Sequence, residues 1–213
     1  MYRAVVFDVD GVLTEIDSIW KFIHERLGTW DKAKKYAMLF KKGKIDYIKW
    51  AELDVALWRG IPFSEIEKIV QEVKIRKGAK ELINFLKQKG LKTFAISAGL
   101  DVLTAYVAEA LKLDKAVSNE LIVKEGTLTG EVKVKVLYNN KDKVLRDICK
   151  KEGIKPSETI AIGDSEVDLP MMEQSGFSIA INPSSYEVAR KANLTIYLND
   201  LRELIPVMKA LLS

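Results

Sequence analysis

Two aspartates stand two residues apart at the end of a short apolar run near the start of the chain. The run is Ala4–Phe7, and Asp8, Asp10 and Gly11 follow it. Side chains two apart in extended backbone point to the same side, so both carboxylates would face one place. Neighbouring carboxylates raise each other's pKa unless a cation or hydrogen bonds offset their repulsion. This spacing favours a metal site; the competing interpretation is a solvated acidic turn, because Asp and Gly are common turn formers.

Polar residues follow two later apolar segments in the same way. The segment 91–97 ends in Ser97-Ala98-Gly99, and the segment 159–162 leads into Gly163–Asp168. Lys141 stands at the start of an expected helix. Ligands of open parallel sheets bind beyond the carboxyl ends of the strands, so these side chains are expected to converge. The expected group is Asp8, Asp10, Asp164, Asp168, Ser97 and Lys141.

The chemistry of this group fits phosphoryl transfer. Clustered carboxylates with spare coordination room suit Mg²⁺, and Ser97 and Lys141 can donate to phosphate oxygens. Asp8 is the candidate nucleophile and Asp10 the candidate proton carrier. Taken singly, Ser97 could cap a helix, Lys141 could be a surface lysine, and Asp164 could be a turn residue. Their shared position at strand ends favours the joint functional interpretation.

The elements that must position these residues alternate between strand and helix from about residue 77. This alternation predicts an α/β fold with a doubly wound, mainly parallel sheet covered on both faces. A β-hairpin is expected where Gly126 separates two apolar runs. The expected strands are 91–97, a short one near 116–117, 121–123, 128–134, 159–162, 177–181 and 194–197; the expected helices are 79–89, 102–111, 142–152, 169–174 and 201–212.

Between the first strand and this alternating region lies a helical segment. Apolar residues recur at three- and four-residue spacing in 16–27, 31–41, 45–58 and 64–73, and Ser64 with Glu67 has the pattern of a capping box. All four tryptophans fall in this segment, which predicts a small core of its own and aromatic side chains that line a pocket. We therefore expect a helical cap domain over 15–76 and a core domain over 1–14 and 77–213.

Composition narrows the chemistry further. The 213 residues are 48% hydrophobic and 30% charged, with a net charge of +4 spread over mixed surfaces, which predicts neither a nucleic-acid nor a membrane partner. A cytoplasmic location is the expectation, and abundant Lys, Glu and Ile suggest a thermophilic source. His24 is the only histidine and Cys149 the only cysteine. The sequence therefore offers very few ligands for zinc and a single candidate base for a Ser–His hydrolase.

The polar segments together resemble the four motifs of the haloacid dehalogenase superfamily. The segments that carry the resemblance are Asp8–Thr14, Ile96–Gly99, Lys141 and Gly163–Asp168, and the hairpin at 121–130 is similar to that of phosphoserine phosphatases. The resemblance implies a Rossmann-like core, a helical cap and a phosphoric monoester hydrolase that uses Mg²⁺. It implies Asp8 as nucleophile and Asp10 as general acid and base.

The same resemblance assigns the supporting residues. Asp8, the main-chain carbonyl of Asp10, and Asp164 would hold Mg²⁺, with Asp168 supporting them. Ser97, Ala98 and Lys141 would bind the phosphate of a small phosphorylated metabolite.

The departures from the phosphoserine phosphatase pattern concern the substrate. The cap glutamate that meets the serine amino group corresponds to Asp17, and the arginine that meets the carboxylate corresponds to Asp54. Val12 and Val167 replace the usual threonine and asparagine. We expect a phosphatase that acts as a monomer or homodimer, and the sequence does not identify the alcohol of its substrate. The alternatives are a phosphotransferase that uses another alcohol in place of water, and a catalytically silent binding protein.

Overall fold

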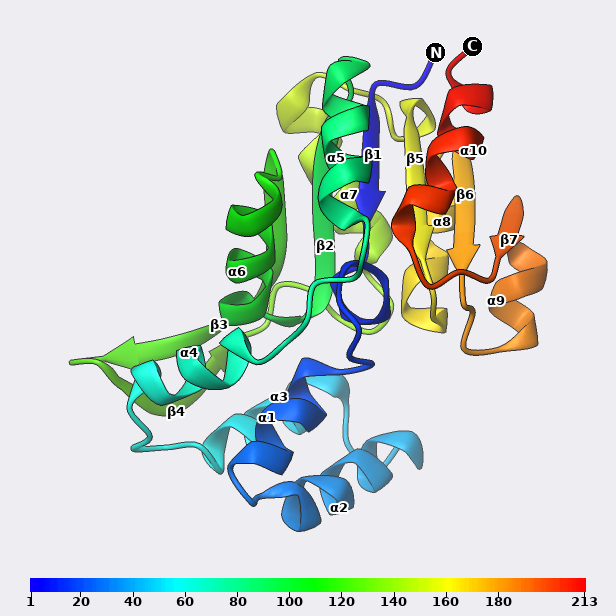
Figure 1. Ribbon diagram of the computed structural model, residues 1–213. Coiled ribbons are helices and arrows are strands. Elements are labelled where there is room, and N and C mark those ends of the chain that lie inside the picture. The colour runs from blue at the N-terminus through cyan, green and yellow to red at the C-terminus, as the bar shows by residue number, and fades with distance from the viewer.

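The computed structural model describes residues 1–213 and centres on one seven-stranded sheet with strand order β4-β3-β2-β1-β5-β6-β7 (Figure 1). Every neighbouring pair is parallel except β3 and β4, which form the hairpin at one edge. The predicted α/β class and mainly parallel sheet are therefore confirmed. The strands are β1 (Ala4–Phe7), β2 (Lys92–Leu100), β3 (Lys115–Lys124), β4 (Thr127–Lys133), β5 (Thr159–Gly163), β6 (Phe177–Ile181) and β7 (Leu194–Ile196).

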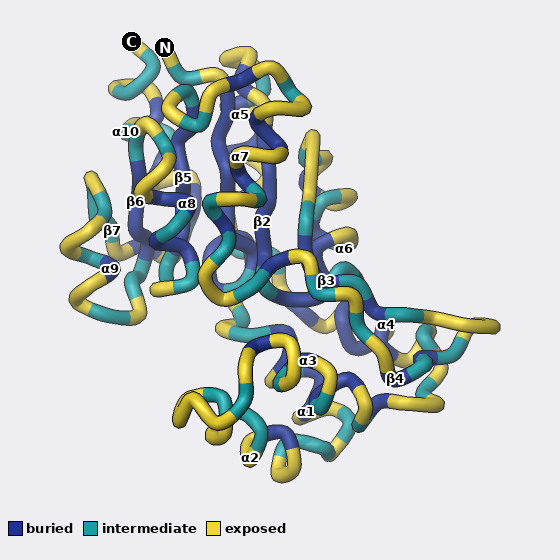
Figure 2. The backbone as a smooth tube through the Cα atoms, turned by 180° about the vertical axis from the view of Figure 1, so that it is seen from behind, coloured by how far each residue is buried: buried dark blue, intermediate teal, exposed yellow.

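Helices cover both faces of the sheet because alternate residues of its central strands point to opposite sides. Val5 and Phe7 pack with helices α5 (Ala79–Gln88), α6 (Asp101–Leu111) and α10 (Leu204–Leu211). Ala4 and Val6 pack on the other face, against helices α7 (Lys141–Glu152), α8 (Leu169–Gln174) and α9 (Tyr186–Lys191). The central strands β1, β2, β5 and β6 accordingly form the most buried part of the chain (Figure 2). No helix is both long and apolar enough to cross a lipid bilayer.

Two strands differ from their predicted bounds by more than one residue. β2 continues to Leu100 through a register shift after Ile96, so Ser97 lies inside an irregular strand rather than beyond its end. β3 is one strand from Lys115 to Lys124, where two short strands were expected. It pairs with β2 along its first half and with β4 along its second. Polar Ser118, Asn119 and Glu120 interrupt the apolar pattern and hide this continuity.

Four helices follow β1 in the chain. They are α1 (Ile19–Arg26), α2 (Trp30–Lys41), α3 (Tyr47–Ala56) and α4 (Phe63–Gln71). α1, α2 and α3 lie beyond the carboxyl end of the sheet, whereas α4 runs beside α6 and the β3–β4 hairpin (Figure 1). The capping box at Ser64 is wrong. Pro62 occupies the N-cap position of α4 instead. The amides of Gly60 and Phe63 donate to the hairpin carbonyls of Leu128 and Gly126, and these bonds fix the start of the helix.

The two connections between these helices and the sheet are joined to each other. Thr14 and Ile75 form an isolated antiparallel bridge, and the amides of Glu15 and Arg76 bond the carbonyls of Lys74 and Leu13. The Arg76 guanidinium also donates to the carbonyls of Gly11, Val12 and Thr14 at 2.7–3.2 Å. The chain that leaves the sheet and the chain that returns are thus held side by side.

Candidate active site

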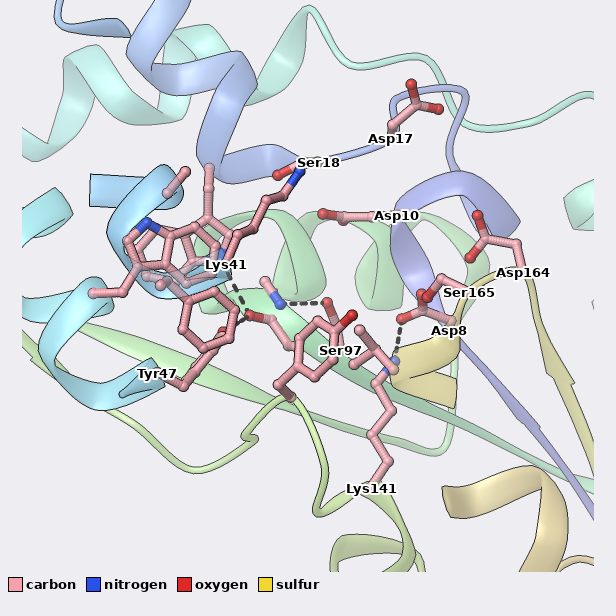
Figure 3. Close-up of a pocket in the computed structure, with 18 residues that line it drawn as sticks. Asp8, Asp10, Asp17, Ser18, Lys41, Tyr47, Ser97, Lys141, Asp164 and Ser165 are labelled. Carbon is pink, nitrogen blue, oxygen red and sulfur yellow. Dashed lines mark hydrogen bonds and ion pairs between the residues drawn. The ribbon is translucent and has the colours of Figure 1, made fainter. Parts of the chain in front are cut away.

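A pocket of about 220 Å³ lies where the carboxyl ends of β1, β2 and β5 meet the helices α1, α2 and α3 (Figure 3). The predicted residues Asp8, Asp10, Ser97, Lys141 and Asp164 all line this pocket. Asp168 is fully buried behind it. The parallel order β2-β1-β5 explains the convergence, because the residues that follow adjacent parallel strands emerge at one edge of the sheet.

Lys141 is the centre of the charge arrangement. Its ammonium donates to Asp8 Oδ1 at 2.7 Å and to Asp168 Oδ1 at 2.6 Å, and the residue has no exposed surface. Burial lowers the pKa of Lys141, but attraction to Asp168 and Asp8 outweighs it and raises the pKa above its ordinary value. Lys141 therefore stays charged and fixes one oxygen of Asp8, which leaves the second oxygen toward the pocket.

Asp168 orders the loop after β5. Its Oδ2 atom accepts hydrogen bonds from the amides of Asp164 and Ser165 at 3.0 Å and from Ser165 Oγ at 3.1 Å. Its other oxygen is bonded to Lys141. Because both oxygens have protein partners, Asp168 acts as a support that positions Lys141 and the segment carrying Asp164.

The three carboxylates that face the pocket are held at raised pKa values. Burial, then repulsion from Asp168, raises the pKa of Asp8 to about 7. Burial raises the pKa of Asp10 to about 6, and burial with repulsion from Asp8 raises that of Asp164 to about 9. Carboxylate oxygens of Asp8, Asp164 and Asp168 lie within 4.8 Å of one another. Oxygen ligands gathered this closely fit a hard cation such as Mg²⁺, which would offset their repulsion.

Asp10 lies in a short turn, Val9–Leu13, that follows Asp8. Its Oδ2 atom accepts the amide of Ile19, the first residue of α1, at 2.8 Å. Its Oδ1 atom is buried without a hydrogen-bond partner. Asp10 thus presents one uncommitted oxygen in the pocket, while its other oxygen ties the turn to the first residue of α1.

The Ser97-Ala98-Gly99 segment supplies the opposite wall. Ser97 Oγ accepts the Gly99 amide at 2.9 Å, so its own proton is free for another acceptor. The Ala98 carbonyl accepts from Trp20 Nε1, Tyr47 Oη and Asn119 Nδ2 at 3.1, 2.6 and 2.9 Å. The first two bonds join α1 and α3 to the sheet beside the pocket.

Comparison with known proteins decides the family. Residues 2–176 match the family model of haloacid dehalogenase-like hydrolases. The chain belongs to this family. The phosphoserine phosphatase of Methanocaldococcus jannaschii is 33% identical over 208 residues, which cover 97% of this chain and 98% of that protein. The phosphoserine phosphatase of Archaeoglobus fulgidus is 35% identical over 84% of this chain. The chain spans about half of that relative, 52% of its length.

Solved structures agree with the sequence comparison. A substrate-bound phosphoserine phosphatase has a TM-score of 0.84 and 31% identity, with 97% of this chain and 98% of that chain covered. A structure of a phospho-aspartyl intermediate analogue of phosphoserine phosphatase has a TM-score of 0.82 and 32% identity, with the same coverage. The resemblance to phosphoserine phosphatase-like members of the haloacid dehalogenase family is thereby confirmed.

Asp17 and Asp54, the two residues of the segment 15–76 that were predicted to contact the substrate, lie in different surroundings. Asp17 is exposed at the pocket rim. Asp54 lies outside the pocket lining and is 2% exposed, with Oδ2 3.5 Å from Nε2 of buried His24. Trp58 Nε1 donates to His24 Nδ1 at 3.2 Å. Burial raises the pKa of Asp54. Asp54 thus belongs to a buried polar cluster with His24 and Trp58, away from the pocket where a substrate-binding role was predicted for it.

Several pocket residues were not singled out from the sequence. The remaining walls are aromatic or small, with one further lysine at the rim; among them are Phe40, Lys41, Tyr47, Trp50 and Tyr138. The sequence signal for them was the concentration of aromatic residues in the segment 15–76, which predicted that some rings line a pocket. Their individual positions depend on how α2 and α3 pack over the sheet, and no local spacing encodes that.

Gly11 gives a test of how closely the first turn approaches Asp164. Its φ is +75°, and a Cβ atom there would lie 2.4 Å from Asp164 Oδ2. We expect Gly11→Ala to displace Asp164 and to weaken Mg²⁺ binding by about 10-fold or more, because misplaced ligands and supports cost metal affinity on this scale. Isothermal titration with Mg²⁺ measures the change.

The matched control for this substitution is Gly60→Ala. Gly60 has φ of +85° and nothing within 4 Å of the added Cβ, so it carries the same backbone strain without the contact. Equal loss of Mg²⁺ affinity in both variants would contradict a specific role for the close approach between Gly11 and Asp164.

Proposed function

We propose that this protein is a Mg²⁺-dependent phosphatase that hydrolyses a small phosphomonoester through a phosphoryl group carried on Asp8. The observation that carries the proposal is the Lys141 ammonium, which holds Asp8 at the base of a pocket shared with Asp10 and Asp164. The family supplies the reaction class: relatives along the full chain are named phosphoserine phosphatase, an enzyme that hydrolyses a phosphomonoester.

Asp8 is the nucleophile in this proposal. Its oxygen that is not bonded to Lys141 attacks phosphorus, an Asp8 O–P bond forms, and the P–O bond to the alcohol breaks. Ser97 Oγ–H and the Lys141 ammonium donate to the phosphoryl oxygens and stabilise their charge. Asp8, Asp164 and the main-chain carbonyl of Asp10 would hold Mg²⁺, which neutralises negative charge on the phosphoryl group when bound.

Asp10 moves the proton. Burial raises its pKa to about 6, so the carboxyl can carry a proton near neutral pH and release it. It protonates the departing alcohol oxygen. It then accepts a proton from the water that attacks phosphorus, and cleavage of the Asp8 O–P bond releases inorganic phosphate. One group thus serves both half-reactions, in opposite protonation states.

We further propose that residues 15–76 act as a cap over the core formed by 1–14 and 77–213. α1, α2 and α3 supply pocket residues, and the joined connections at Thr14 and Ile75 allow these helices to move as a unit. Such a cap excludes water during transfer to Asp8 and selects the alcohol. We also propose a cytoplasmic enzyme of small metabolites that is monomeric or homodimeric, and the abundance of Lys, Glu and Ile supports a thermophilic source.

Hydrolysis of p-nitrophenyl phosphate tests the proposal directly. We expect turnover with Mg²⁺ and a fall of at least about 10²-fold in excess EDTA, because the cation stabilises developing charge by several kcal/mol. Restoring Mg²⁺ to the EDTA sample controls for unfolding. Adding acceptor alcohols while measuring released phosphate separates hydrolysis from transfer to another alcohol. Absence of turnover under all conditions would favour a silent binding protein.

A further inference from the structure

The part of the pocket beyond the phosphate end is walled by aromatic rings. Trp20, Phe40, Tyr47 and Trp50 come from three cap helices, and Tyr138 comes from the loop before α7. The Phe40 and Trp50 rings are stacked, with centroids 5.1 Å apart and planes at 12°. Phe40 also contacts Tyr138 edge-on at 5.7 Å, so the wall is continuous from the cap to the core.

Two polar atoms of this wall have protein partners, and a third, Trp50 Nε1, is buried beneath the surface without one. Tyr47 Oη donates to the Ala98 carbonyl at 2.6 Å and accepts from Asn119 Nδ2 at 3.2 Å. Trp20 Nε1 donates to the same carbonyl at 3.1 Å. A bound alcohol therefore meets mainly the carbon faces of these rings, and Figure 3 shows Tyr47 on the same side of the pocket as Lys41.

Charged side chains on this side of the pocket stand only at its rim. Lys41 and Asp17 line the opening and are exposed, and Figure 3 shows them on different sides of it. Asp54 is buried outside the lining. A serine leaving group would bring an ammonium and a carboxylate against ring carbons, and burying ions without partners is costly. The wall therefore disfavours a zwitterionic alcohol.

We infer that the preferred substrate carries a flat apolar alcohol that lies against Phe40 and Trp50. This inference rests on the proposed phosphatase activity and deepens it. A cavity of about 150 Å³ lined by apolar side chains accommodates benzene, and the pocket volume of about 220 Å³ leaves additional room for a phosphate. Benzyl phosphate represents this class, since it combines one ring with a primary alcohol.

The test compares three phosphate esters of primary alcohols at saturating Mg²⁺, so leaving-group chemistry is similar. We expect kcat/KM for benzyl phosphate to exceed that for O-phosphoserine and for ethyl phosphate by about 10-fold or more, since ring contacts and avoided ion burial both favour it. Phe40→Ala should reduce the ratio of benzyl to ethyl phosphate by about 5-fold, mainly through KM.

Leu39→Ala is the matched control, because Leu39 neighbours Phe40 on α2 but is 39% exposed and outside the pocket lining. We expect its benzyl-to-ethyl ratio to equal that of the wild type. O-phosphoserine turned over as well as benzyl phosphate would overturn the inference and leave the phosphatase intact. So would an equal loss for both esters in Phe40→Ala. No Mg²⁺-dependent turnover of any ester, p-nitrophenyl phosphate included, would overturn the proposed function itself.

Discussion

Asp8→Asn abolishes turnover, with an expected loss of at least about 10⁴-fold in kcat, the scale seen when a covalent nucleophile is removed. The substitution keeps the size of the side chain. The amide oxygen can still accept the hydrogen bond from Lys141, which measures 2.7 Å in the wild-type protein. What disappears is the carboxylate oxygen that attacks phosphorus. Steady-state hydrolysis of p-nitrophenyl phosphate measures the loss.

Acid quenching distinguishes this explanation from a general disturbance of the site. Wild-type protein stopped during turnover should carry one phosphoryl group on the peptide that contains Asp8, detected by mass spectrometry, and Asp8→Asn should carry none. Asp147→Asn, an exposed aspartate on α7, serves as the matched control with wild-type activity. A fully active Asp8→Asn protein would remove Asp8 from the mechanism.

Lys141→Met lowers kcat/KM by at least about 10²-fold and also weakens the fold, because one cation serves both roles. The substitution removes a charged donor to the phosphoryl group, and loss of one such donor costs about 10²–10³-fold. It also leaves Asp8 and Asp168 buried without their shared cation. Breaking a buried ion pair in this way costs about 3–5 kcal/mol. Chemical denaturation in EDTA measures the second effect.

Two comparisons sharpen the Lys141 result. Lys143→Met changes an exposed lysine two residues along the same helix and is expected to alter neither activity nor stability. Adding Mg²⁺ should recover part of the stability of Lys141→Met. A cation near Asp8 offsets part of the repulsion between the Asp8 and Asp168 carboxylates, which Lys141 no longer compensates. Wild-type stability in Lys141→Met would contradict the charge arrangement derived from the two short contacts of Lys141.

The convergence of Asp8, Ser97 and Asp164 on one pocket could be predicted from the sequence because its signals are local. The apolar run before Asp8 and the polar residues after 91–97 and 159–162 follow from strand burial and sheet connectivity, which short segments encode. The same reasoning misplaced the end of β2. Ser97-Ala98-Gly99 has the composition of a strand end, yet the chain continues to Leu100 because β3 supplies partners across a register shift.

The packing of the helical segment 15–76 was less predictable because its important contacts join distant residues. Asp54 and His24 lie on different helices, and their pairing removes Asp54 from the solvent. The position of Phe40 beside Tyr138 depends on the packing of α2 against the core. Periodicity identified four helices but could not say which rings would face the reaction. The sequence therefore predicts the class of reaction but does not identify the alcohol of the substrate.

The bridge between Thr14 and Ile75 has an evolutionary consequence. The excursion from the sheet begins and ends at adjacent points, locked by Arg76 to the carbonyls of the turn after Asp8. Closing a longer loop between fixed ends adds little entropic cost, about 0.6 kcal/mol for each doubling of length. The residues between Ile19 and Ile75 can therefore lengthen, shorten or be exchanged while the amide of Ile19 still holds Asp10. One reaction can in this way acquire new substrates by replacement of a single module.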